Sequence, residues 1–141
     1  MKTLRQTLQQ AESDAVAIGH FNISDLVGLK SAFDSARELN VPVIVGTSEG
    51  EREFMGVHQA ATVVKSLCEQ YEFPIFLNAD HTHSLKAAIE AAKAGYDWVV
   101  FDVSSQPLEQ NIRQTKETVE ALKSIWPDTA TKCPFFRSSS L

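Results

Sequence analysis

The stretch PIFLNADHTHSLKAAIEAAKAGYDWVVFDVSS (residues 74–105) carries the strongest signal of the fold, because it reads as strand, helix and strand in succession. Residues 74–79 and 97–103 are continuous apolar runs rich in Val, Ile and Phe, which is typical of strands covered on both faces. Between them, apolar residues recur at helical spacing over 85–92, and Gly95 suits the left-handed residue that ends a helix. The stretch therefore predicts a β-α-β unit with parallel strands.

The same pattern extends toward the N-terminus. Residues 15–21 and 41–47 are two further apolar runs of strand length, and a helical pattern follows each of the four runs. A short helix is expected before the first run. The chain thus predicts an α/β fold of about four βα units.

Two architectures fit this order of elements. One is an open, doubly wound sheet of four strands, and the other is a partial (β/α)8 TIM barrel, whose complete form takes about 250 residues. The length of 141 residues favours the open sheet if the chain is complete. The polar ends of the strands favour the partial barrel, because parallel α/β folds bind ligands at the carboxyl ends of their strands.

Composition narrows the classes of function. The chain is 43% hydrophobic and 22% charged, as in one soluble globular domain. Its formal net charge of −5, without a local basic stripe, disfavours nucleic acid or an anionic membrane as a partner. No run approaches the roughly 18 apolar residues of a membrane span, so we expect a cytoplasmic location. The two cysteines are far apart and form neither a disulfide framework nor a metal knuckle.

Every predicted strand ends in polar residues. The four ends read HFNIS, GTSEGE, NADHTHS and FDVSS. Because the carboxyl ends of parallel strands meet at one edge of a sheet, these side chains are candidates for a single site. The candidates are Asn22, Ser48, Asp80, His81, His83, Asp102, Ser104 and Ser105.

The segment NADHTHS leaves three interpretations open. In extended backbone, Asp80 and His81 point to opposite sides, whereas His81 and His83 share a side and would present two imidazoles to one metal. Two ligands do not complete a tetrahedral zinc site, so two hydrogen-bonded edge histidines explain the spacing equally well. Asp80 would then be a helix N-cap, although Ser84 is better placed for that role. Spacing alone does not separate a metal site, an acid-base site and a polar strand end.

Other motifs are uninformative or absent. The sequence contains no Walker lysine motif, no GxGxxG and no Gly-x-Ser-x-Gly elbow, which disfavours nucleotide binding and serine hydrolysis. We expect EGERE (residues 49–53) to form a solvated loop, and His20 and His58 to be structural or surface residues.

The chain resembles the N-terminal half of the class II, metal-dependent ketose-bisphosphate aldolases, which act on fructose or tagatose bisphosphate. The resemblance spans roughly residues 3–128. It is carried by HFNISDLVGLKSAF, VPVIVGTSEGE, PIFLNADHTHS, AAIEAAKAGYDWVVFDVSS and PLEQNIRQTKETVEAL, and most specifically by the pair Asp80-His81 and by Asn111, Thr115 and Lys116.

This resemblance implies a TIM barrel in which three histidines hold zinc. The family cleaves or forms a ketose 1,6-bisphosphate, with dihydroxyacetone phosphate and glyceraldehyde 3-phosphate as the other partners, through a zinc-stabilised enediolate. By position, Asp80 matches the carboxylate that exchanges a proton with the aldehyde-derived hydroxyl, and His81 matches the first zinc ligand. The resemblance thus implies zinc as cofactor, a phosphorylated sugar as partner, and a homo-oligomer for the full-length family.

Further residues follow from the resemblance by position. Asp102 is a candidate for a polar contact near the metal, although Val103 stands where the family has Gly or Ala. Ser48 and Asn22 line the same mouth of the predicted sheet and, for that reason, are candidates for substrate contacts. His83 has no general catalytic role in the family, so the resemblance favours His81 alone over a His-x-His pair.

The other two zinc histidines that the resemblance implies are not found in this sequence. We expect residues 1–128 to form the N-terminal half of the barrel, and residues 129–141 (TATKCPFFRSSSL) to be an aberrant tail, out of reading frame or the end of a partial gene. Without two of the zinc histidines, we expect this chain to be inactive by itself. Two alternatives are a non-catalytic chain that self-associates and an open-sheet α/β domain that binds a small molecule.

Overall fold

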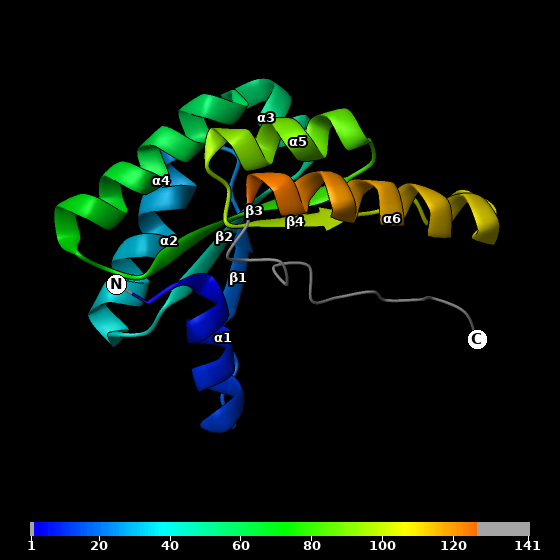
Figure 1. The fold of residues 1–141 in the computed structure, drawn as a ribbon. Coiled ribbons are helices and arrows are strands. Elements are labelled where there is room, and N and C mark those ends of the chain that lie inside the picture. The colour runs from blue at the N-terminus through cyan, green and yellow to red at the C-terminus, as the bar shows by residue number, and fades with distance from the viewer. Residues whose placement is uncertain (1, 127–141) are drawn as a thin grey trace.

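A single parallel sheet forms the centre of the molecule, as the computed structural model of residues 2–126 shows (Figure 1). Its strands are β1 (Gly19–Asn22), β2 (Val43–Thr47), β3 (Ile75–Thr82) and β4 (Trp98–Phe101). They lie in the order β1-β2-β3-β4, without a reversal in the part of the chain that the structure describes. Successive strands of a TIM barrel lie side by side in this order, whereas in a doubly wound sheet the order of the strands reverses at a switch point. The predicted α/β class and partial barrel are therefore confirmed.

Helices follow the strands as the sequence predicts, with one addition. They are α1 (Leu4–Ser13), α2 (Leu26–Leu39), α3 (Glu49–Met55), α4 (Val57–Tyr71), α5 (Leu85–Ala94) and α6 (Leu108–Ile125). The expectation of a solvated loop at residues 49–53 is wrong, because they form most of α3. Ser48 and Glu51 make a capping box, which satisfies the first N–H groups of the helix and so starts it.

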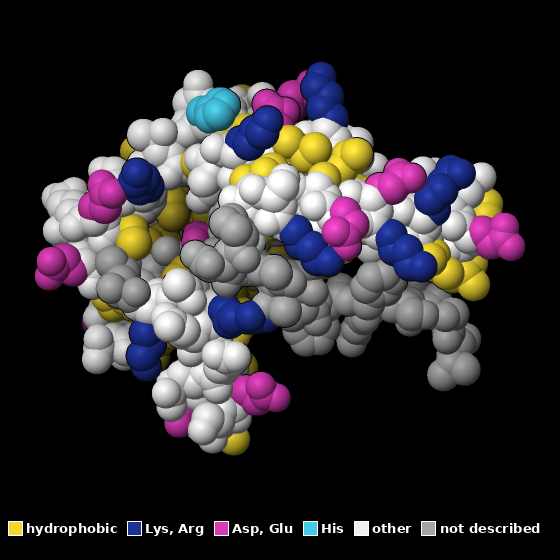
Figure 2. Space-filling model, viewed as in Figure 1, with side chains coloured by type: hydrophobic (Ala, Val, Ile, Leu, Met, Phe, Trp, Pro, Cys, Tyr) yellow, Lys and Arg dark blue, Asp and Glu magenta, His cyan; other side chains and the backbone are white. Residues whose placement is uncertain are grey.

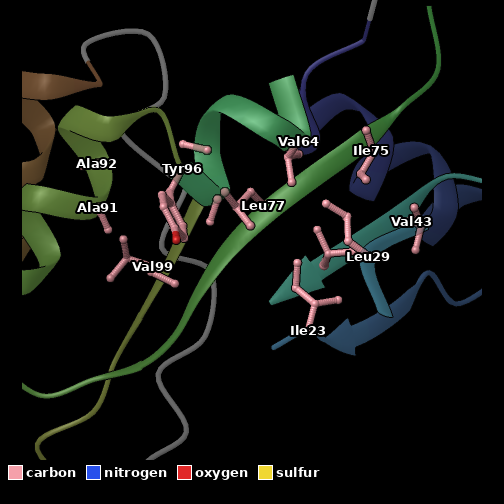
Figure 3. Close-up of a cluster of buried hydrophobic side chains, with 14 of the residues drawn as sticks. Ile23, Leu29, Val43, Val64, Ile75, Leu77, Ala91, Ala92, Tyr96 and Val99 are labelled. Carbon is pink, nitrogen blue, oxygen red and sulfur yellow. The ribbon is translucent and has the colours of Figure 1, made fainter. Parts of the chain in front are cut away.

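The main core lies between the sheet and the helices that follow its strands. Alternate residues of β2 and β3 point into this layer, as expected for side chains that alternate across a strand. Apolar residues of α2, α4, α5 and α6 pack against them. Figure 3 shows this layer, with the labelled side chains Ile23, Leu29, Val43, Val64, Ile75, Leu77, Ala91, Ala92, Tyr96 and Val99.

A smaller cluster covers the opposite face of the sheet. Leu4 of α1 packs against Ile44 and Phe76, which alternate with the core residues of β2 and β3. Figure 1 shows α1 apart from the other helices. The face of the sheet that α1 covers is the inner face, and it becomes polar toward the carboxyl ends of the strands, where Asn78 follows Phe76 along β3 beside Gly46 of β2. The polar residues at the carboxyl ends of the strands therefore lie next to the apolar cluster of Leu4, Ile44 and Phe76.

Several predictions concern surfaces and termini. No helix within residues 2–126 is both long enough and apolar enough to cross a membrane. Acidic and basic side chains are mixed over the face in Figure 2. The predicted tail at residues 129–141, including Cys133, lies outside the described residues.

Candidate functional site

Two of the predicted site residues meet across the inner face of the sheet. The Asn22 side chain at the end of β1 donates through Nδ2 to Oδ2 of Asp80 in β3, at 3.0 Å. The strand between them, β2, carries Gly46 at this level. A Cβ at Gly46 would lie 2.6 Å from Oδ1 of Asn22, so glycine leaves the space through which Asn22 reaches Asp80.

A polar pair lies one step deeper on the same face. The amide Nδ2 of Asn78 lies 3.1 Å from Nε2 of His20. Because the amide nitrogen only donates, the imidazole nitrogen is the acceptor in this contact. Asn78 is buried, and its Oδ1 has no protein partner within residues 2–126. His20 therefore has a structural contact, as the sequence analysis expected.

The backbone of β3 is irregular at the predicted Asp-His pair. The pairing of β3 with β4 shifts register between Ala79 and Thr82, and His81 has a φ of 39°. A residue other than glycine rarely adopts this left-handed conformation, and bulges next to functional sites often redirect a side chain. The expectation that Asp80 and His81 point to opposite sides was drawn for regular extended backbone, and this bulge replaces that geometry.

Both histidines of NADHTHS are held by Asp102, which follows β4. Nδ1 of His81 lies 2.8 Å from Oδ2 of Asp102, and Nδ1 of His83 lies 2.7 Å from the Asp102 carbonyl oxygen. A carbonyl oxygen only accepts, so Nδ1 of His83 carries a proton. Likewise, the Asp102 carboxylate orients the His81 ring through Nδ1, which leaves Nε2 as its other ligating atom. The structure therefore brings His81, His83 and Asp102 together.

Hydrogen bonding shifts the titration of this cluster. Hydrogen bonds from Ser104, followed by the bond from His81, lower the pKa of Asp102 to about 2. The hydrogen bond to Asp102 raises the pKa of His81. Asp102 is therefore a carboxylate at neutral pH, and in the metal-free chain it favours the protonated His81 ring.

Ser48 and Glu49 connect α3 to this region in different ways. The Ser48 hydroxyl accepts from the N–H of Glu51 at 3.4 Å as a helix cap, so its contact is with the first turn of α3. Glu49 accepts the N–H of His83 through Oε1 at 2.8 Å, a contact that the sequence analysis missed. Ser84 caps α5, as predicted, through a bond from the N–H of Ala87.

Arg52 is the principal residue that the sequence analysis missed. Its side chain is 4% exposed and donates to the carbonyl oxygens of Thr47 and Asp80 and to the hydroxyl of Thr82. Burial lowers the pKa of its guanidinium. The capping box of Ser48 and Glu51 was the sequence signal that could have revealed Arg52. It begins a short helix, and the first turn of that helix places Arg52 beneath the strand ends.

Two of the residues noted in the sequence of α6, Asn111 and Thr115, have structural hydrogen bonds. Nδ2 of Asn111 donates to the Val103 carbonyl oxygen at 3.1 Å, and the Thr115 hydroxyl donates to Oδ1 of Asn111 at 3.3 Å. These bonds tie α6 to the loop that carries Asp102. Val103 is buried, so its departure from the expected small residue is accommodated in the packing.

The described residues include only part of a metal-binding set. Within residues 2–126, no three His, Cys, Asp or Glu side chains are placed to hold one metal ion. His81 is exposed, which keeps Nε2 open to a ligand. The site thus contains the His81 imidazole, oriented by Asp102, and the neighbouring Asp80 carboxylate, which is bonded to the Asn22 amide.

Comparisons with known sequences identify relatives of this chain. The family model for class II fructose-bisphosphate aldolase matches residues 2–126. The fructose-bisphosphate aldolase of Helicobacter pylori is 32% identical over 116 residues, which are 82% of this chain and 38% of that protein. The probable fructose-bisphosphate aldolase of Bacillus subtilis is 32% identical over 121 residues, covering 84% of this chain and 42% of that protein.

Comparisons with solved structures agree in fold. The YdjI aldolase of Escherichia coli K12 matches with a TM-score of 0.80 and 26% identity, over 89% of this chain and 49% of that one. The fructose-bisphosphate aldolase of Campylobacter jejuni matches with a TM-score of 0.74 over 86% of this chain and 43% of that one, and at 20% identity this likeness concerns the fold alone. The chain spans half or less of the length of these relatives.

Proposed function

The chain belongs to the class II fructose-bisphosphate aldolase family, and from this premise we propose that it supplies part of the active site of a zinc-dependent aldehyde-lyase. The reaction would join or separate dihydroxyacetone phosphate and glyceraldehyde 3-phosphate, the two halves of a ketose 1,6-bisphosphate. The observation that supports this most directly is the pair Asp80 and His81 at the β3 bulge. Each is held by a different neighbour, Asn22 for the carboxylate and Asp102 for the imidazole.

In this proposal Asp80 moves the proton. The Asn22 amide donates to one carboxylate oxygen and so orients the carboxylate, and the other oxygen would exchange the proton with the hydroxyl derived from the aldehyde. General acid-base catalysis requires a group within hydrogen-bond reach of the transferred proton, and a fixed orientation favours it. Because Asn22 lies beside the Asp80 carboxylate, it would also contact substrate.

His81 would be the zinc ligand of this half of the site. An imidazole whose Nδ1 is bonded to a carboxylate is the usual form of a metal-binding histidine, and Asp102 provides that carboxylate. When bound, zinc supplies a Lewis acid that draws charge from the substrate carbonyl. A catalytic zinc site takes three protein ligands, so in this proposal the others would come from outside residues 2–126.

The remaining candidates have supporting roles in the proposal. The His83 imidazole donates to the carbonyl oxygen of Asp102 and so holds the loop that carries Asp102. Ser48 caps the N-terminus of α3. Residues 1–128 would be the N-terminal half of the barrel, and residues 129–141 would lie outside it. As in its family, a cytoplasmic homo-oligomer that binds no nucleic acid would be the working form.

A direct test begins with the 141-residue chain. We expect it to hold less than one equivalent of zinc and not to cleave fructose 1,6-bisphosphate, because one imidazole binds zinc too weakly. Residual zinc binding should be lost in His81→Ala and retained in His58→Ala, the matched change of an exposed histidine in α4. Equal loss in both variants, or turnover by the chain alone, would contradict the proposal.

The role of Asp80 needs a complete barrel. Residues 1–126 joined to the part of the Bacillus subtilis relative that this chain does not match should cleave fructose 1,6-bisphosphate in the presence of zinc. Asp80→Asn in this chimera should lower kcat by about 10²–10⁴-fold, the usual contribution of general acid-base catalysis. An active chimera that tolerates this substitution would rule out Asp80 as the proton carrier.

A non-catalytic, self-associating chain is the second candidate. All four residues of β1 are exposed, and β1 is an edge strand of the sheet. An unpaired edge can pair with another chain. Sedimentation velocity over a range of concentrations distinguishes this candidate, which requires oligomers that form without zinc.

A further inference from the structure

The Arg52 side chain connects three elements beneath the candidate site. It extends from α3 and donates to the Thr47 carbonyl at the end of β2. It also donates through Nη1 to the Asp80 carbonyl at 3.2 Å and through Nη2 to the Thr82 hydroxyl at 2.9 Å. Asp80 and Thr82 are the two neighbours of His81, so the guanidinium spans the bulge from one side to the other.

The bulge is a strained part of the chain that requires such support. His81 has a φ of 39°, a conformation that persists in residues other than glycine only where the surrounding structure imposes it. The guanidinium is planar and presents its donors in a fixed geometry, so the acceptors it binds are held at fixed relative positions. These contacts therefore restrain the backbone at residues 80 and 82 and, through them, at His81.

The charge of Arg52 is buried and satisfied mainly by neutral oxygens. No carboxylate within residues 2–126 lies within 4.0 Å of its guanidinium, although Glu49, Glu51 and Asp80 are close enough to act on its charge. A buried cation is unfavourable unless its donors are paired. Displacement of the strand ends would therefore leave the guanidinium unpaired, which couples its position to theirs.

The same contacts reach the neighbouring strands. The Thr47 hydroxyl lies 3.0 Å from the hydroxyl of Tyr96, which is fully buried before β4. The Thr82 carbonyl accepts the N–H of Asp102 at 2.9 Å. A continuous set of hydrogen bonds thus runs from Arg52 to both residues that flank His81 and to the residue that orients its ring.

We propose that Arg52 is a positioning residue, which holds the β3 bulge and thereby sets the placement of Asp80, His81 and Asp102 relative to one another. What the positioned residues do rests on the proposed function. The positioning itself concerns the backbone of the metal-free chain and is measured without zinc or substrate.

Amide hydrogen exchange and NMR couplings of the 141-residue chain test this role. In Arg52→Met, the N–H groups of His83 and Asp102 should exchange at least about tenfold faster, while the N–H of Ile23, bonded to Gly46, keeps its protection. The HN–Hα coupling of His81 should move toward the value of extended backbone. Arg113→Met, an exposed arginine of α6, should leave all these quantities unchanged.

A second pair of variants covers the case in which Arg52→Met does not fold. Thr82→Val removes the hydroxyl that binds Nη2 and keeps the side-chain shape, whereas Thr82→Ser keeps the hydroxyl. Thr82→Val should reproduce the local loss of protection, and Thr82→Ser should not. Equal behaviour of these two variants, or a uniform change at all amides in Arg52→Met, would overturn the positioning role.

These results separate the two proposals. A chain that neither binds zinc nor contributes to cleavage in the chimera, but loses the bulge in Arg52→Met, contradicts only the proposed function. A bulge that survives Arg52→Met contradicts only the positioning role.

Discussion

Asp102 is the residue at which the two histidines of the NADHTHS segment converge. Its carboxylate bonds to His81 and its carbonyl bonds to His83, so one residue orients both rings. The sequence placed Asp102 among polar strand ends but did not assign these contacts, because they join the ends of β3 and β4 across 21 and 19 residues of chain. A contact of this kind depends on strand register, which no local pattern contains.

The raised pKa of His81 provides a test at this scale. Asp102→Asn removes the carboxylate that stabilises the charged ring, so the His81 pKa should fall toward its ordinary value. NMR titration of the metal-free chain measures it, with His58 as the internal control. Because the folded pKa is raised, the stabilisation from this pair is present below the unfolded pKa, about 6.5, and is lost as pH rises through the folded pKa. An unchanged His81 titration would contradict the assigned contact.

The elements of the chain were predicted where their signals are local. Apolar runs located the four strands, and Gly95 ends α5 in the left-handed conformation, as expected. The signal for α3 was present in the capping box of Ser48 and Glu51, but the charged segment was interpreted as a solvated loop. That error concealed Arg52, because a charged residue in a short polar segment is usually exposed.

The cap of α5 provides a test at the scale of elements. Ser84→Ala removes the acceptor for the Ala87 N–H and should lower the free energy of unfolding by about 1 kcal/mol. Urea denaturation followed by circular dichroism measures it. The matched variant Ser35→Ala, at an exposed position inside α2, should change stability by less than about 0.5 kcal/mol. Equal effects of the two substitutions would show that the Ser84 cap does not contribute.

The whole molecule is organised as two layers on the sheet, which differ in extent. The main core joins the sheet to α2, α4, α5 and α6, whereas α1 covers only the amino end of the inner face. The polar strand ends therefore remain accessible above an apolar base. Because side chains alternate along a strand, each strand contributes to both layers, and the helices on each face set how far each layer extends.

A matched pair of leucines tests this organisation. Leu77→Ala, at a position 1% exposed within the main core, should cost about 2–5 kcal/mol and shift the urea midpoint strongly, because it leaves a cavity. Leu39→Ala, at a position 72% exposed, should have an effect below about 0.5 kcal/mol. Equal midpoint shifts would contradict the assigned layers.

By itself, the sequence determined the alternation of strands and helices, the parallel sheet and the set of polar residues at one edge. Each of these follows from periodicity and capping, which act over a few residues. Only the tertiary structure decided the uninterrupted strand order, the bulge at His81, the joining of His81 to Asp102 and the burial of Arg52. These features depend on register and on contacts between distant segments, where the free energy of packing outweighs the preference of any single residue.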